Sequence, residues 1–192
     1  MNAATQYGVQ IVRASNETEH VWTAVSVRHL TPSENRGRHA VYVDVIDEDG
    51  NRDRNPSLRI GYFDFDGDTT PSFKVLDKPE TPMELGDGNV DLYTSQTLSV
   101  WLSGYGLSSD MVTGIHSRHA DEPGPNGENW NSYGHHSFKI VFQRQRVSVV
   151  PPEPDEPTEP LPEVDGEVLA VLEDHESRMR RFEKWARSFP SA

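Results

Sequence analysis

The chain contains no cysteine, which excludes both a disulfide framework and a thiolate metal site. Its stability must therefore come from packing. Positive charge is also scarce, because 18 Lys and Arg residues face 31 Asp and Glu residues, a formal net charge of −13 at pH 7. Binding to a phosphate backbone needs clustered positive charge. Nucleic acid is therefore not expected as a partner.

Long apolar runs are absent as well. No segment approaches the roughly 20 apolar residues that cross a membrane, and residues 1–15 lack the basic start and apolar run of a secretory signal peptide. We therefore expect no membrane partner. No glycine-rich phosphate loop, nucleophile elbow or zinc-protease motif occurs in a fitting context. The prediction is a protein that is not an enzyme and uses no cofactor.

Short segments of alternating apolar and polar residues fill most of the chain. Such segments occur at residues 7–13, 20–30, 39–47, 58–62, 97–104, 111–115 and 137–143, and turns rich in Gly, Pro, Asn and Asp separate them. Strands at this spacing are typical of an antiparallel sandwich rather than of alternating strands and helices. We predict a mainly β fold: one immunoglobulin-like antiparallel β-sandwich of about seven to nine strands over residues 1–148.

Two acidic segments have a second interpretation. The Asp-Gly pair in EDGN (48–51) predicts a hairpin turn whose return strand carries Leu58, Ile60 and Tyr62. Acidic residues at alternate positions around Gly50, and again in DFDGD (64–68), also resemble calcium loops. Gly50 is misplaced for an EF-hand, so a turn is the preferred interpretation in both cases.

Three blocks carry a resemblance to known proteins. The blocks HAVYVDVIDEDGN (39–51), SVWLSGYGLSSDMVTGI (99–115) and GHHSFKIVFQ (134–143) resemble the accessory immunoglobulin-like or transthyretin-like sandwich modules of bacterial surface and phage proteins. The likeness lies in the pattern of alternating strands and turns, and it covers about residues 7–148. It implies a structural or binding protein on a phage virion surface, such as a capsid decoration, head fibre or tail-associated protein. A bacterial cell surface or extracellular location is the alternative.

The C-terminal quarter changes in character. Residues 149–163 hold six prolines and five acidic residues, which predicts an extended tether. Residues 164–192 then show a heptad spacing that predicts an amphipathic helix for docking or oligomerisation. A helix of this length is marginal alone and needs a partner. The predicted contact residues are Val168, Leu172, His175, Met179, Phe182, Trp185 and Phe189.

The loop that precedes the last strand holds the candidate sites. His116, His119, His135 and His136, with Asp121 or Glu122, offer ligands for zinc, the chemistry that a histidine-metal hydrolase would need. If His135 and His136 begin a strand, their side chains point to opposite faces, and only one of the two can then reach a given site. A structural role for these histidines, with no metal, is the preferred interpretation.

Aromatic residues on loops suggest a different ligand. Tyr105, Trp130 and Tyr133 could stack on a surface glycan, because loops at one end of a sandwich commonly carry recognition. The competing interpretation is that Trp130 fills the end of the core or a subunit contact. A carbohydrate-binding module is therefore the alternative function.

Overall fold

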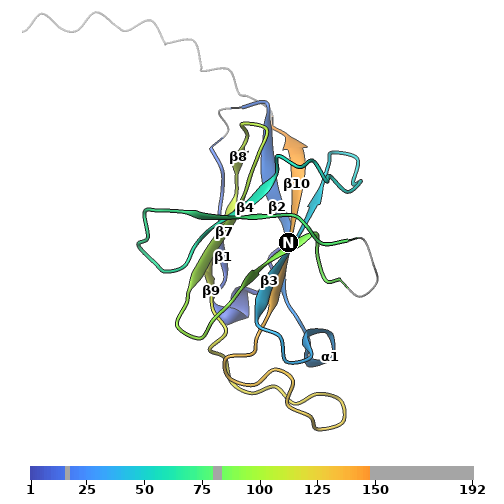
Figure 1. The fold of residues 1–192 in the computed structure, drawn as a ribbon, viewed down its shortest axis with the longest axis vertical. Coiled ribbons are helices and arrows are strands. Elements are labelled where there is room, and N and C mark those ends of the chain that lie inside the picture. The colour runs from blue at the N-terminus through green and yellow to red at the C-terminus, as the bar shows by residue number, and fades with distance from the viewer. Residues whose placement is uncertain (16–17, 80–83, 148–192) are drawn as a thin grey trace, which may run out of the picture. The chain divides into compact units, whose positions relative to one another are not determined.

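The computed structural model describes residues 1–15, 18–79 and 84–147 (Figure 1). The predicted tether (149–163) and C-terminal helix (164–192) lie outside these residues and stay predictions. Within the described residues the fold is mainly β, as the alternating pattern predicted. No helix in this part of the chain is long and apolar enough to cross a membrane.

Ten strands and two short helices make up the described part of the chain. The helices are η1 (Thr5–Tyr7), a 3-10 turn, and α1 (Pro32–Asn35). The strands are β1 (Gln10–Val12), β2 (His20–His29), β3 (Ala40–Ile46), β4 (Arg59–Phe63), β5 (Ser72–Val75), β6 (Gly88–Asp91), β7 (Leu98–Ser103), β8 (Ser108–Ser109), β9 (Met111–Ile115) and β10 (Phe138–Arg146). The two-residue strand β8 raises the number one above the predicted range.

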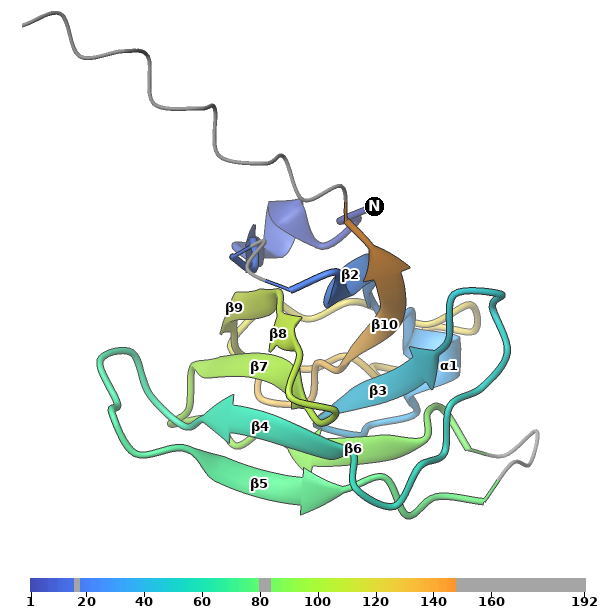
Figure 2. The ribbon, with the colours of Figure 1, turned by 90° about the horizontal axis from the view of Figure 1, so that it is seen from above.

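The strands form two five-stranded sheets, with the orders β1-β9-β7-β4-β5 and β6-β3-β10-β2-β8 (Figure 1, Figure 2). Both sheets contribute apolar side chains to one core. The predicted alternation is confirmed in β3, β7 and β10, whose inward residues are fully buried. These residues are Val41, Val43, Val45, Leu98, Val100, Leu102, Phe138, Ile140 and Phe142.

The prediction of purely antiparallel pairing is wrong for the second sheet. β10 lies between β2 and β3, antiparallel to β2 and parallel to β3. β2 and β3 run in opposite directions, so any strand inserted between them must be parallel to one of the two. The two-residue strand β8 also pairs parallel to β2. The sheet is therefore mixed.

The predicted hairpin after β3 is half right. A turn does form, because the Asp47 carboxylate accepts hydrogen bonds from the backbone amides of Asp49 (3.0 Å) and Asn51 (2.8 Å). The next strand, β4, does not return alongside β3 but pairs with β5 and β7 in the other sheet. The chain therefore crosses from one sheet to the other after the turn. Ile60 of β4 is buried in the core that the two sheets share.

A bulge in β2 changes which residues face the core. Ser26 pairs with Val141 and Ala24 with Phe142, so Val25 is an extra residue between them. Strict alternation along β2 would place Val25 and Val27 on one face and Trp22 on the opposite face. Because the bulge reverses the phase of the strand, Trp22 and Val27 both enter the core while Val25 stays partly exposed.

Candidate functional site

The long loop between β9 and β10, residues 116–137, folds back on the end of β2. Ser137 fixes its last residues, because its carbonyl accepts from the Leu30 amide (2.9 Å) and its hydroxyl from the Ala40 amide (3.0 Å). β2 and β10 are paired here, with His29 opposite Phe138. This register places His136 beside His29, although the two residues are far apart in sequence.

Two buried asparagines hold the middle of the loop. The Asn131 amide nitrogen donates to the Leu30 carbonyl and to Glu122 Oε2, each at 2.9 Å. Asn35 of α1 donates to Asn131 Oδ1 at 2.8 Å, and neither asparagine is exposed. The Glu122 amide also donates to the Asn131 carbonyl at 2.7 Å. These bonds fix the Glu122 carboxylate at the end of the core.

Four imidazoles gather there, which we call the histidine cluster: His29, His116, His119 and His136. His29 Nε2 lies 2.8 Å from His136 Nδ1. The His119 ring is edge-on to that of His136, at 5.1 Å between centroids, and is stacked on that of His116 at 4.2 Å. Each of the four rings therefore contacts at least one other imidazole.

Tyr7 and Glu122 complete the surroundings of His29. The Tyr7 ring stacks on His29 with centroids 3.9 Å apart, and its hydroxyl donates to Glu122 Oε1 at 2.8 Å. Glu122 Oε2 lies 3.9 Å from His29 Nδ1. The carboxylate thus accepts one hydrogen bond on each oxygen, from Tyr7 and from Asn131, and faces an imidazole.

The electrostatics keep these imidazoles neutral near pH 7. Burial lowers the pKa of His29 to about 4, although the Glu122 carboxylate opposes this shift. Burial also lowers the pKa values of His116, His119 and His136. Burial raises the pKa of Glu122, but hydrogen bonds from Asn131 and Tyr7 outweigh this effect and leave it below its ordinary value. Neutral imidazoles next to a carboxylate are the protonation states in which these groups bind metals.

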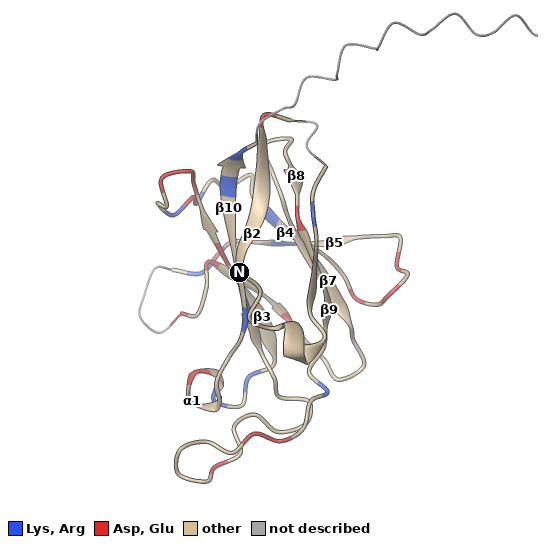
Figure 3. Cartoon of the chain, turned by 180° about the vertical axis from the view of Figure 1, so that it is seen from behind, with Lys and Arg blue, Asp and Glu red and all other residues tan. Residues whose placement is uncertain are grey.

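Three of these side chains form a compact donor set. His29, Glu122 and His136 can each offer one ligand atom such that all three atoms lie within 4.8 Å of one another. Acidic residues of the long loop are visible in red in Figure 3, next to the end of the sheets that holds these histidines. Two imidazoles and one carboxylate are a set that zinc uses in proteins.

The sequence identified part of this site. His119, Glu122 and His136 come together, with His116 stacked beside them. His135 does not, since it is exposed and its Nδ1 lies 3.1 Å from the Ser132 hydroxyl. Of the adjacent pair, His136 lies in the cluster and His135 does not, although neither belongs to β10, which begins at Phe138.

His29 was missed by the sequence reasoning. It ends a segment that alternates like an ordinary strand, and nothing near it in sequence suggests a site. Only the pairing of β2 with β10 brings it to His136. The one signal available was its type, because a histidine is an uncommon choice for the buried end of a strand.

The three aromatic residues proposed as one ligand site are separated, which corrects that prediction. Tyr105 follows β7 and stacks on Trp22 near the start of β2, with centroids 5.8 Å apart. Tyr133 and the half-buried Trp130 belong to the long loop at the other end of β2. Trp22 and His29 are seven residue steps apart along β2, which is roughly 23 Å of strand.

A different set of residues gathers where the loop that carries Tyr133 meets the loop after β6. Tyr93 and Tyr133 are 56% and 59% exposed. Arg118 joins their two loops, because its guanidinium donates to the carbonyls of Thr94 (2.8 Å) and Gln96 (2.7 Å). The His39 ring contacts Tyr93 at 5.6 Å and His135 at 6.0 Å. We call this area the tyrosine surface: Tyr93, Tyr133, His39, His135 and the supporting Arg118.

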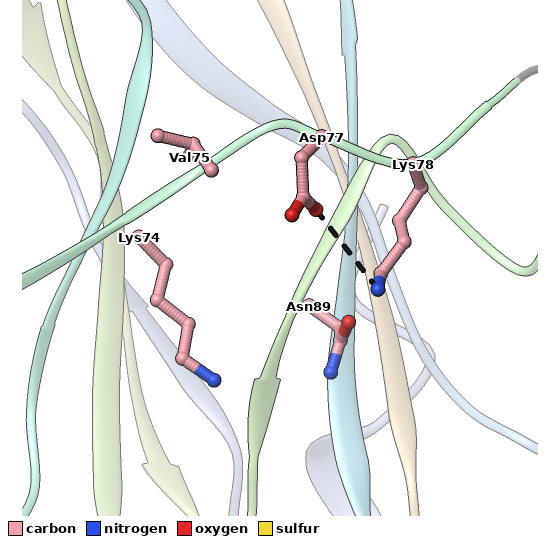
Figure 4. Close-up of a pocket in the computed structure, with 5 residues that line it drawn as sticks. All are labelled: Lys74, Val75, Asp77, Lys78 and Asn89. Carbon is pink, nitrogen blue, oxygen red and sulfur yellow. Dashed lines mark ion pairs between the residues drawn. The ribbon is translucent and has the colours of Figure 1, made fainter.

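A pocket of about 250 Å³ lies elsewhere, between β5 and β6 (Figure 4). Its lining is Lys74, Val75, Asp77, Lys78 and Asn89. Both lysines already have acidic partners, Asp91 for Lys74 at 3.1 Å and Asp77 for Lys78 at 3.9 Å. The pocket therefore offers no free charge from its lysines for a ligand.

Comparison of the chain with protein families, with curated protein sequences and with solved structures finds no match. The histidine cluster and the tyrosine surface are therefore the two candidate functional regions of the described residues.

Proposed function

We propose that this chain is a non-enzymatic structural and binding protein, an immunoglobulin-like β-sandwich displayed on the surface of a phage virion. Two sheets that share one core support the sandwich architecture. The pattern of strands and turns in the sequence supports the resemblance to virion and bacterial surface modules. In this proposal the sandwich is a rigid support, its loops meet a ligand, and the C-terminal segment attaches it to the particle.

The tyrosine surface carries the proposal. Tyrosine is an effective contact residue because it offers a large amphipathic area at low cost in conformational entropy. The surface is held in place before any ligand arrives, since the Tyr133 amide donates to Asp121 Oδ1 at 2.8 Å and Arg118 joins the adjacent loop. Such preorganisation reduces the entropy lost on binding. Exposed aromatics on braced loops favour recognition over catalysis.

The attachment half of the proposal concerns residues 149–192, outside the described part of the chain. It is supported by the proline-rich composition and the heptad spacing, which suit a tether and a docking helix. The helix would bind a partner protein of the assembly or copies of itself.

Two variants separate the two halves of the proposal. A chain that ends at Val150 should keep ligand binding but lose its attachment to native particles and any self-association. The full chain with Tyr93→Ala and Tyr133→Ala should lose ligand binding but keep its attachment to native particles and its self-association. Attachment is measured by gold labelling of purified particles in negative-stain microscopy, and solution mass by light scattering. Equal attachment of the truncated and full chains would contradict the anchoring role, and an absence of label on any regular particle would contradict the virion location.

A second candidate function, carbohydrate recognition, is favoured by the exposed Tyr133 with Trp130 on the same loop. Sugar rings stack on aromatic faces of this kind. A glycan array probed with the full chain should show binding that Tyr133→Ala removes and that Tyr105→Ala, at the other end of β2, leaves unchanged. Equal loss in both variants, with both folded by circular dichroism, would show that the Tyr133 loop is not the sugar site.

A further inference from the structure

We propose that His29, His119, Glu122 and His136 form a binding site for one divalent transition metal ion, with Zn²⁺ as the expected ion, which links the 116–137 loop to the end of β2. The sequence alone favoured no metal. The arrangement of side chains in three dimensions is what supports one.

The donor set has the right chemistry and nearly the right spacing. His29, Glu122 and His136 supply ligand atoms within 4.8 Å of one another. Zinc binds imidazole nitrogen and carboxylate oxygen at roughly 2.0–2.2 Å, so the ligand atoms of a tetrahedral site lie somewhat over 3 Å apart. A small contraction around Glu122 therefore closes the site, and the metal replaces the hydrogen bond that joins His29 Nε2 to His136 Nδ1 at 2.8 Å, with loss of its proton. Glu122 is the ligand expected to shift, together with its partners Tyr7 and Asn131, because its side chain is 32% exposed whereas that of His29 is 6% exposed.

Buried nitrogen atoms without partners point to the missing ligand. His136 is wholly buried, and its Nε2 has no hydrogen-bond partner among the described residues. The Ala120 backbone interacts with the His136 ring and favours its protonated form, but it makes no hydrogen bond of normal geometry with Nε2. His119 Nε2 is also buried without a partner, on a ring 5.1 Å from that of His136. Buried polar groups are nearly always satisfied, so two such nitrogens side by side require an explanation.

The surroundings have the form of an outer shell around a metal. Tyr7 and Asn131 each donate to one oxygen of Glu122, and Asn35 in turn holds Asn131. Outer hydrogen bonds of this kind orient carboxylate and imidazole ligands and increase metal affinity. The three predicted ligands outside β2 belong to the long loop. The metal would therefore act as a structural link that fastens this loop to the end of the core.

The test is a metal titration of the full chain after treatment with a chelator. Zn²⁺ should bind with a stoichiometry of one per chain by calorimetry, and Co²⁺ should give visible absorption bands of a low-symmetry site. Zn²⁺ should also raise the melting temperature, because it binds the folded chain only. His119→Ala and Glu122→Gln should weaken zinc binding by roughly tenfold or more, the loss that ligand and outer-shell changes produce.

His135→Ala is the matched control, since it removes the adjacent imidazole that lies outside the cluster, and it should bind zinc like the parent chain. His119 is only partly buried, so its variant is expected to fold, and circular dichroism checks this. Two outcomes would overturn the proposal: a folded parent chain that shows no saturable zinc binding, or a His135→Ala variant that loses as much affinity as His119→Ala. The readout does not depend on virion attachment or on any glycan, so it is independent of the proposed function.

Discussion

At the scale of single residues, Asp110 shows how one buried carboxylate joins three segments. It is 2% exposed and precedes β9. Its oxygens accept from the backbone amides of Ala14 (2.9 Å) and Ala24 (3.0 Å) and from the Arg13 guanidinium (2.6 Å). The segment after β1, the middle of β2 and the start of β9 are thus fixed to one side chain.

Asp110→Ala should lower the free energy of unfolding by about 2–4 kcal/mol, because it leaves the buried Ala24 amide and the neighbouring Ala14 amide without an acceptor. Arg13→Ala is the control. The Arg13 side chain is 64% exposed, so its ion pair should contribute at most about 1 kcal/mol. Urea denaturation of both variants measures the difference. Equal losses would mean that the ion pair, and not the amides, carries the stabilisation.

The histidine cluster predicts an acid-sensitive fold in the metal-free protein. The pKa of His29 falls from its ordinary value of 6.5 to about 4 because of burial. The unfolded chain therefore binds a proton before the folded chain does, so stability should be complete above pH 6.5 and decrease as the pH falls toward 4. Urea denaturation of chelator-treated protein across this range measures the effect. His29→Asn should flatten the profile, and an unchanged slope would assign the acid sensitivity to other groups.

At the scale of elements, β4 and β7 show a close contact on the outer face of their sheet. Gly61 of β4 pairs with Trp101 of β7. The indole covers the glycine and lies 4.9 Å from the Phe63 ring and 6.3 Å from the Phe73 ring, between centroids. Trp101 thus packs on side chains of neighbouring strands, because the missing side chain at Gly61 leaves room for it.

Gly61→Ala should destabilise the protein by about 1–3 kcal/mol, the cost of forcing a methyl group into a filled space. A Cβ atom at Gly61 would lie 2.4 Å from Trp101 Cε2, so the indole would have to move. The same substitution in a Trp101→Ala background should cost much less. Chemical denaturation of the four proteins completes the cycle, and a cost that is equal in both backgrounds would show that the indole is not the obstacle.

At the scale of the whole molecule, both sheets depend on one core. Residues from nearly every long strand belong to a single buried cluster, with Trp22, Phe138 and Phe142 as its largest members. Neither sheet has a separate set of buried apolar residues large enough to stabilise it alone, within the part of the chain that the structure describes.

A chain that ends at Val150 should therefore unfold in one cooperative transition. Far-ultraviolet circular dichroism follows the strands and the near-ultraviolet signal follows the packed aromatics, and the two midpoints should coincide. A near-ultraviolet transition at lower denaturant would mean that side-chain packing is lost before the sheets.

The sequence by itself determined which segments become strands and which residues of most strands face the core. Alternation at Leu98, Val100 and Leu102 is a local property, because successive side chains of a strand point to opposite faces wherever the strand lies. The turn at Asp47 is local for the same reason, since its hydrogen bonds join residues two and four apart.

Only the tertiary structure decided which strands pair, and hence what the candidate site contains. Nothing local to β2 or β10 specifies that they lie side by side, that β10 runs parallel to β3, or that a bulge at Val25 reverses the phase of β2. The proposed metal site depends on that pairing, because His29 ends β2 and His136 lies two residues before β10. Strand pairing is set by the burial of all the apolar faces together, and this is why His29 could not be identified from its own segment.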